Sequence, residues 1–170
     1  RSTRSTWQQW EPVFRANLTG TMYLSRRIAE EMLKNEPSVF GMRGSIIQIT
    51  SIHDAIVRRF HSEYAVSKAG QAMLVRELAV ALGPHGIRVN GIAPGRIDTD
   101  PDIVSHDQRQ DDRFTTLNWK AGLPRDVARA CLFLASDTLS SFVHGAVLKV
   151  SGGLHLWDHM CELYPPEGRP

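Results

Sequence analysis

The sequence predicts an α/β fold built on a parallel sheet, because three short apolar segments alternate with longer segments of helical periodicity. The short segments cover residues 45–50, 87–92 and 145–150, and they are rich in the β-branched residues that favour strands. Strands that alternate with long helices imply right-handed crossovers, which place neighbouring strands parallel. With 170 residues, of which 42% are hydrophobic, the chain is long enough for one domain with a real core. We therefore expect residues 1–170 to form a single domain.

The first predicted helix covers residues 10–35. Its apolar residues recur at spacings that place them on one face of a helix: Phe14, Leu18, Met22, Ile28 and Met32. Pro12 suits the first turn, where a missing backbone N–H leaves no helical hydrogen bond unmade. A run of helix-breaking residues from Glu36 to Gly44 then leads into the first predicted strand.

The second and third predicted helices have clear start and stop signals. The helix over residues 63–82 ends at Gly83 and Pro84. The helix over residues 124–136 begins with Pro124 and carries an acidic residue in its first turn. A predicted strand follows each helix, as a βαβ arrangement requires.

Two further segments show no clear periodicity. Residues 96–123 are polar and dense in Asp and Arg, which is typical of a mobile flap rather than of a core element. Residues 154–170 are interpreted as a terminal tail, packed through Leu154, Leu156 and Trp157.

Composition and charge argue against several classes of partner. The formal net charge is +2 and 22% of residues are charged, so neither a nucleic-acid nor an anionic membrane partner is predicted. No apolar run approaches the ~20 residues that cross a bilayer. Cys131 and Cys161 form no metal-ligand motif, and the histidines show no metal-like spacing. We predict no metal site and a reducing, cytoplasmic setting.

Tyr64 and Lys68 form the first candidate constellation. Residues four apart lie one above the other on a helix, so the phenol and the amine can serve one site. A phenol with an ordinary pKa of about 10 is a poor base at neutral pH, and a nearby ammonium favours its ionised form. Ser51 follows the first predicted strand, where open α/β sheets bind their ligands. Taken alone, the same spacing is also typical of two polar residues on a solvated helix face.

Several motifs in a fixed order are more specific than this pair. They are "NLTG" from Asn17, "GSIIQITS", "YAVSK", "GIRVNGIAPGRIDTD", "GLPRDVARACLFLASD" and "GAVLKVSGG". The run resembles the C-terminal two-thirds of a short-chain dehydrogenase/reductase, over residues 10–153. The resemblance implies a partial Rossmann-like fold, with a doubly wound parallel sheet of which only three strands are visible and the first half is missing.

The resemblance also implies a role for each member of a catalytic set. Tyr64 would be the general acid/base that exchanges a proton with the substrate oxygen. Lys68 would favour the ionised tyrosine and bind the ribose of the nicotinamide cofactor. Ser51 would orient the substrate oxygen, and Asn17 would hold a water that links Lys68 to solvent.

The turn after the second predicted strand would contact the nicotinamide itself. Pro94 and Gly95 match the turn that passes close to the ring, and Ile97 and Thr99 match positions that bind its carboxamide. Asn90 matches a structural asparagine near the end of the strand. The implied cofactor is NAD or NADP, and the implied substrate is a small alcohol or ketone.

The glycine-rich cofactor loop of the family is missing from these residues. No GxGxxG precedes a helix, and the family's first four strands also have no counterpart. The strand at residues 45–50 would then have a bare, apolar edge. By resemblance, the two long helices over residues 10–35 and 63–82 would pair between subunits, which predicts a homodimer or homotetramer.

Two functional readings from different classes follow. The first is an NAD(P)-dependent oxidoreductase that interconverts a secondary alcohol and a ketone. His53, two residues after Ser51, resembles the Ser-x-His of some glucose dehydrogenases in the family, which indicates a sugar or polyol substrate; a histidine of an ordinary loop is the alternative. The second reading is a non-catalytic remnant that binds no cofactor alone and acts only through oligomerisation. A dehydratase or epimerase is less favoured, because those reactions need a different set of active-site residues.

Overall fold

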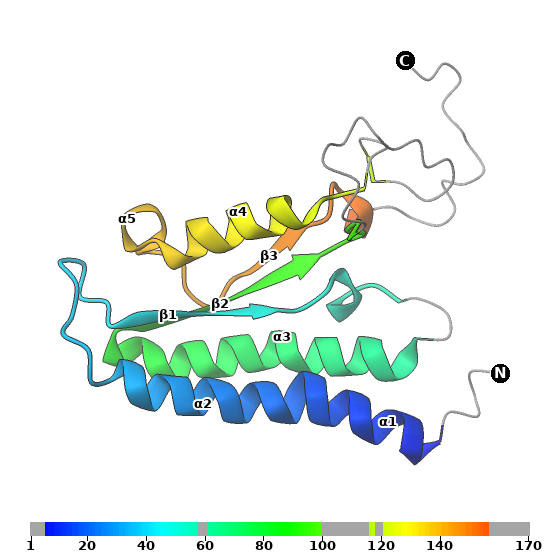
Figure 1. Cartoon of the computed structure of the whole chain (residues 1–170), viewed down its shortest axis with the longest axis horizontal. Helices are drawn as coiled ribbons and strands as arrows, with labels where there is room; N and C mark the ends of the chain where they lie inside the picture. Colours follow the sequence, from blue (N-terminus) through cyan, green and yellow to red (C-terminus); the bar gives the residue numbers. More distant parts are fainter. Residues whose placement is uncertain (1–5, 58–60, 100–115, 118–120, 157–170) are drawn as a thin grey trace.

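A three-stranded parallel sheet lies between two layers of helices (Figure 1). The computed structural model describes residues 6–57, 61–99, 116–117 and 121–156. The strand order follows the sequence: β1 (Gly44–Ile49), β2 (Ile87–Pro94) and β3 (Val147–Val150). Both neighbouring pairs are parallel, with β2 in the middle. The predicted α/β class is confirmed, although β3 begins at Val147 rather than at residue 145.

The helices on one face of the sheet are α1 (Trp7–Phe14), α2 (Thr21–Met32) and α3 (Ser62–Leu82). The first predicted helix is correct in type but wrong in detail, because it begins at Trp7 and a π-helical turn interrupts it at Arg15–Gly20. Thr6 is its N-cap residue, and the Gln9 side chain accepts a hydrogen bond from the Thr6 N–H.

Pro12 does not lie in the first turn of this helix, contrary to the prediction. It lies inside α1, because the helix begins three residues earlier than the apolar periodicity indicates. Trp7 is 72% exposed, so packing supplies no signal for the first turn, and the cap at Thr6 sets the start instead.

The main hydrophobic core lies between the sheet and this helical layer. Ala29 from α2 and Val75 and Ala79 from α3 pack against Ile46, Ile87 and Val89 of the strands. Small residues on the helices allow them to approach the sheet closely, while the β-branched side chains of the strands fill the space between. Gly86, with a φ of 75°, turns the chain from the end of α3 into β2.

The opposite face of the sheet carries α4 (Pro124–Ala135) and α5 (Asp137–Ser140). Its organising contact is a buried arginine of β2. Arg88 donates to the carbonyl oxygen of Leu134 at 2.8 Å and to the Asp137 carboxylate at 2.9 Å. The guanidinium therefore satisfies the end of α4 and pairs with the first residue of α5.

The flap predicted over residues 96–123 lies largely outside the described residues. Its two described ends meet, because Ile97 forms a parallel bridge with Gly122 and the Asp98 N–H donates to the Gly122 carbonyl at 2.8 Å. In the predicted tail, Leu154–Leu156 form a short 3₁₀ turn. Leu156 is 71% exposed, so its predicted packing is wrong, while Leu154 is half-buried and Trp157 lies outside the described residues.

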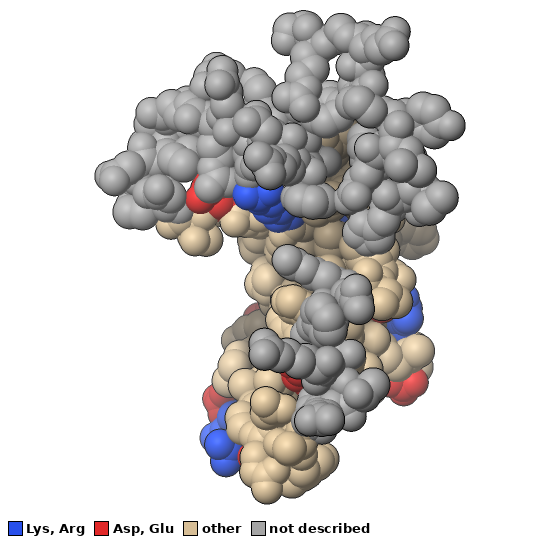
Figure 2. Space-filling view, turned by 90° about the vertical axis from the view of Figure 1, so that its right-hand side faces the viewer, with Lys and Arg blue, Asp and Glu red and all other residues tan. Residues whose placement is uncertain are grey.

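The described residues show neither a membrane span nor a cluster of metal ligands. None of their helices is long and apolar enough to cross a bilayer. Within the same residues, no three His, Cys, Asp or Glu side chains are grouped as metal ligands would be. On the face shown in Figure 2, Lys and Arg side chains lie close to Asp and Glu side chains.

Candidate active site

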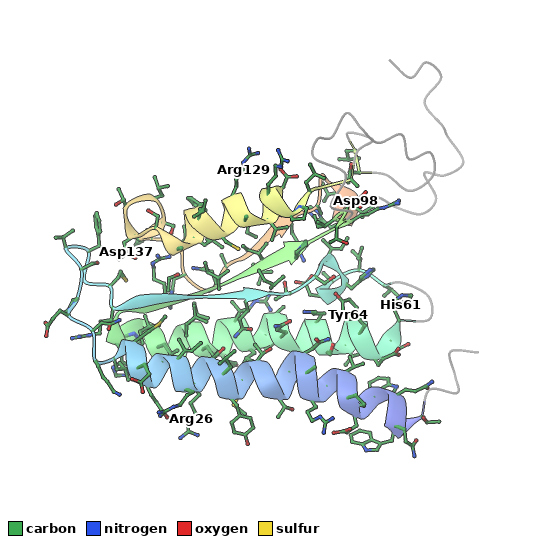
Figure 3. The ribbon with its side chains drawn as sticks, viewed as in Figure 1. Arg26, His61, Tyr64, Asp98, Arg129 and Asp137 are labelled. Atoms are coloured by element: carbon green, nitrogen blue, oxygen red, sulfur yellow. The ribbon has the colours of Figure 1, made fainter. Side chains whose placement is uncertain are left out.

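The candidate site lies at the carboxyl end of the sheet. All three strands point toward this end of the molecule, and Tyr64 and His61 lie there at the start of α3 (Figure 3). Ser51 follows β1, and Pro94 is the last residue of β2. Parallel strands bring these positions together although they are far apart in the sequence.

Ser51 is held in a fixed, buried position. Thr50 anchors Ser51, because the N–H and the hydroxyl of Thr50 both donate to the Ile92 carbonyl of β2, at 2.7 and 3.1 Å. The Ser51 side chain caps a 3₁₀ turn (Ile52–Asp54) by accepting from the His53 N–H at 3.2 Å. The Ser51 hydroxyl still carries a proton that it can donate to a ligand oxygen.

The ion pair between Lys149 and Asp54 fastens the turn after Ser51 to the end of β3. The Asp54 side chain is only 5% exposed, so the Asp54 end of this ion pair is buried. A turn held at both ends keeps the Ser51 hydroxyl in place, which is what a substrate-orienting group requires.

Lys68 is buried beneath Tyr64. Its ammonium donates to the Ile49 carbonyl at 2.9 Å and to the Gln71 side-chain oxygen at 2.8 Å, and it lies 5.8 Å from the centre of the Tyr64 ring. Burial lowers the pKa of this amine, because removal from water disfavours the charged form. The pair is therefore not on a solvated helix face.

Asn17 lies in the π-helical turn between α1 and α2 and reaches α3 directly. Its side-chain N–H donates to the Ser67 hydroxyl at 3.0 Å, and that hydroxyl donates to the Tyr64 carbonyl at 2.7 Å. The Asn17 carbonyl accepts from the Thr21 hydroxyl at 2.9 Å. The π-helical turn, a frequent feature of functional sites, thus connects Asn17 to the turn of α3 that carries Tyr64 and Lys68.

The proposed nicotinamide end of the site begins where β2 ends. A side chain at Gly95 would come within 2.8 Å of the Ser151 Cα, so only glycine fits at this crossing. Ile97 is fixed by its bridge to Gly122, and Thr99 is exposed at the last described position before residue 100. Asn90, predicted to be structural, is fully buried and binds Val143 and Ala146 in the loop before β3.

Sequence reasoning missed Gln71 and His61. Gln71 lies three residues after Lys68 on the buried side of α3, and a polar residue among Ala72 and Val75 is the signal that could have found it. His53 packs edge-on against Tyr64 with ring centres 6.1 Å apart, and His61 stacks beside His53 at 6.5 Å. The three rings therefore form one aromatic group at the start of α3.

Comparison with protein families shows which family the chain belongs to. A short-chain dehydrogenase family model, described as enoyl-(acyl carrier protein) reductase, matches residues 1–155. The chain belongs to the short-chain dehydrogenase/reductase family. Among its relatives are glucose 1-dehydrogenase 2 of Bacillus subtilis, 33% identical, and an L-rhamnose 1-dehydrogenase of Sphingomonas, 34% identical. The alignments cover 91% and 86% of this chain but only 58% and 56% of the relatives.

Solved structures of the family have the same fold over the same portion. The chain matches a 3-oxoacyl-(acyl carrier protein) reductase of Brucella melitensis with a TM-score of 0.74 at 32% identity, covering 90% of this chain and 54% of that one. It matches an acetoin dehydrogenase of Salmonella typhimurium with a TM-score of 0.77 at 26% identity, covering 92% and 59%. This short-chain dehydrogenase/reductase chain thus spans a little over half the length of the relatives it matches.

Proposed function

We propose that this chain carries the catalytic part of an NAD(P)-dependent oxidoreductase that interconverts a secondary alcohol and a ketone. The observation that carries the proposal is the burial of the Lys68 ammonium 5.8 Å from the Tyr64 ring, with Ser51 held at the carboxyl end of the adjacent strand. Burying an ammonium costs free energy, so its burial at this place indicates a role in a reaction rather than in packing.

The residues present fit the nicotinamide half of such a cofactor. Lys68 has three N–H donors, and its two protein acceptors among the described residues leave one donor for a ribose hydroxyl. Gly95 keeps the backbone beyond β2 free of side-chain atoms, next to Pro94. When bound, the nicotinamide supplies or accepts the hydride of the reaction.

The protein groups then manage the proton. In alcohol oxidation, ionised Tyr64 takes the proton of the substrate hydroxyl, while a hydride leaves the carbon atom that bears this hydroxyl. In ketone reduction, the phenol returns that proton to the oxygen. The Lys68 ammonium lies 5.8 Å from the centre of the phenol ring, and the Ser51 hydroxyl donates to the substrate oxygen and orients it.

The decisive variant is Tyr64→Phe, tested in any form of the protein that shows turnover. We expect turnover to fall by at least about 10²-fold, because the general acid/base is lost, while cofactor affinity stays within about twofold. The matched control is Tyr23→Phe, which removes the hydroxyl of a tyrosine that is 61% exposed on α2 and should leave turnover unchanged. Turnover retained in Tyr64→Phe would refute the proposed role.

We propose a sugar or polyol as the substrate class. The support is His53, whose ring lies edge-on against Tyr64 beside the position of the reacting oxygen. Relatives include proteins named for glucose and for L-rhamnose. A panel of aldoses, polyols and simple secondary alcohols, each with NAD and NADP, tests this. Equal kcat/KM for wild type and His53→Ala on an aldose would count against it.

The second candidate function is a non-catalytic remnant that acts by association. It is favoured by the exposed apolar side chains of α2 and α3, which include Leu24, Met73 and Val80. Fluorescence titration of the 170-residue chain with NADH and NADPH separates the candidates. Saturable binding at micromolar concentrations would exclude the remnant, and absence of binding at millimolar concentrations would support it for this chain alone.

A further inference from the structure

Gln71 occupies a position between the catalytic lysine and the π-helical turn. Its side chain is buried, with 5% of the residue exposed. One end of its amide contacts the Lys68 ammonium at 2.8 Å, and the other end contacts the Thr21 hydroxyl of α2 at 3.4 Å. Thr21 in turn donates to the Asn17 carbonyl. A continuous chain of hydrogen bonds therefore runs from Asn17 through Thr21 and Gln71 to Lys68.

The direction of each bond in this chain is fixed by chemistry. An ammonium can only donate, so the Gln71 oxygen must face Lys68 and the Gln71 NH₂ must face Thr21. The Thr21 hydroxyl accepts a hydrogen bond from Gln71 and donates its own hydrogen bond to the Asn17 carbonyl. The Gln71 amide is thereby held in one orientation, with its acceptor toward the amine.

We propose that Gln71 is a positioning residue for Lys68, holding the ammonium charged and in place beneath Tyr64. The inference rests on the proposed function for the part that Lys68 plays in turnover, but the contact itself can be tested without turnover. Gln71 would supply one of the two protein acceptors that the described residues offer the buried amine, the other being the Ile49 carbonyl. A buried cation that loses an acceptor is destabilised relative to its neutral form.

The groups around Lys68 leave this task to Gln71. Tyr64, on the same helix, is the titratable side chain that faces the ammonium. From β1 the Ile49 carbonyl reaches it, and from α2 the Thr21 hydroxyl acts through Gln71, and both are neutral. No carboxylate bonded to Lys68 is found among the described residues. The burial that lowers the pKa of Lys68 is thus opposed by dipoles, of which the Gln71 oxygen is the nearest.

The experiment follows the ionisation of Lys68 in the 170-residue chain itself. With ¹³C-labelled lysine, the four lysines of the chain give four signals, and Lys68→Arg assigns the one from Lys68. Two variants are compared with wild type. In Gln71→Leu the acceptor is lost, so the Lys68 signal should titrate at lower pH. In Gln71→Glu a carboxylate takes its place, so the signal should titrate at higher pH.

A matched control separates this effect from loss of any buried glutamine. Gln48 is 4% exposed and bonds to Ser25 at 3.1 Å rather than to Lys68, so Gln48→Leu should leave the Lys68 titration unchanged. An unchanged titration in both Gln71 variants would overturn the proposal, as would a Gln48→Leu effect equal to that of Gln71→Leu. If Gln71→Leu fails to fold, the direction of the Gln71→Glu shift still decides. Failure of the proposed function would appear separately, as turnover retained in Tyr64→Phe.

Discussion

At the scale of single residues, Lys68 is a charged amine in a buried position, where its charge lowers the stability of the fold. Lys68 is 9% exposed and its pKa is lowered by burial. Burial of this amine therefore opposes stability at a position to which we assign a role in proton transfer. The two hydrogen bonds to Ile49 and Gln71 offset part of the burial.

This opposition predicts a pH dependence of stability. Because the pKa of Lys68 is lower in the folded than in the unfolded chain, the unfolded chain binds more protons between the folded pKa and about 10.4. The contribution of Lys68 to the free energy of unfolding must therefore rise with pH across this window. We expect the unfolding free energy of wild type, measured by urea denaturation, to increase relative to Lys68→Met from pH 7 to pH 10.

The control for this prediction is a lysine that is not buried. Lys34, two residues after the end of α2, has a side chain that is 69% exposed and pairs with Glu31 on the surface. Lys34→Met removes the same charge from the surface, so subtracting its effect corrects the comparison for the loss of a lysine in general. A flat wild-type minus Lys68→Met difference would show that Lys68 does not titrate with a lowered pKa.

At the scale of elements, Arg88 connects β2 to the helical layer behind it. The guanidinium donates hydrogen bonds to the Leu134 carbonyl, to the Asp137 carboxylate and, at 3.1 Å, to the buried Ser140 hydroxyl. Arg88→Met should lower the free energy of unfolding by about 3 kcal/mol, because the end of α4 loses its donor and Asp137 loses its partner. Urea denaturation measures the change.

The matched control for this element is Arg129→Met on α4. Its side chain is 73% exposed and lies 3.7 Å from Asp126, so the change should stay within about 0.5 kcal/mol. Equal losses in the two variants would mean that the buried contacts of Arg88 do not stabilise the α4 layer.

The same scale shows what the sequence could and could not predict. The three strands, the helix that carries Tyr64 and the helix that begins at Pro124 were readable, because burial imposes periodicity and breakers mark their ends. The π-helical turn was not, because "RANLTG" has the same apolar spacing as ordinary helix and its extra residue per turn leaves no local mark.

The candidate site divides in the same way. Strand ends and helix spacing made Ser51, Tyr64 and Lys68 candidates, and only the family resemblance favoured them over polar residues on a solvated face. The contacts of Gln71 with Thr21 and of Asp54 with Lys149 join residues 50 and 95 positions apart, so they depend on how helices and strands pack. The catalytic and cofactor-binding roles remain predictions from the family resemblance for all of these residues: Asn17, Ser51, Tyr64, Lys68, Pro94, Gly95, Ile97 and Thr99.

At the scale of the whole molecule, the chain presents apolar surface on its helical face. On α2, Leu24 and Ile28 lie one turn apart and are 61% and 37% exposed. On α3, Val66, Met73 and Val80 recur every seven residues and are all exposed, which forms a second apolar stripe. Exposed apolar residues gathered on one helical layer are candidates for an interface between proteins.

We propose that these stripes pair with their counterparts in a second copy, giving a homodimer or homotetramer. A charge placed within such an interface is desolvated without a partner, so Leu24→Arg should convert the oligomer to monomer in sedimentation velocity experiments. The control is Val39→Arg, at a position that is 95% exposed in the loop before β1, where the oligomer should persist. A wild-type chain that sediments as a monomer at high micromolar concentration would refute the proposal. Because the stripes lie on α3, which carries Tyr64, and on α2, which follows the π-helical turn of Asn17, dissociation by Leu24→Arg should also loosen the site, and weaker NADH binding in the monomer would reveal that link.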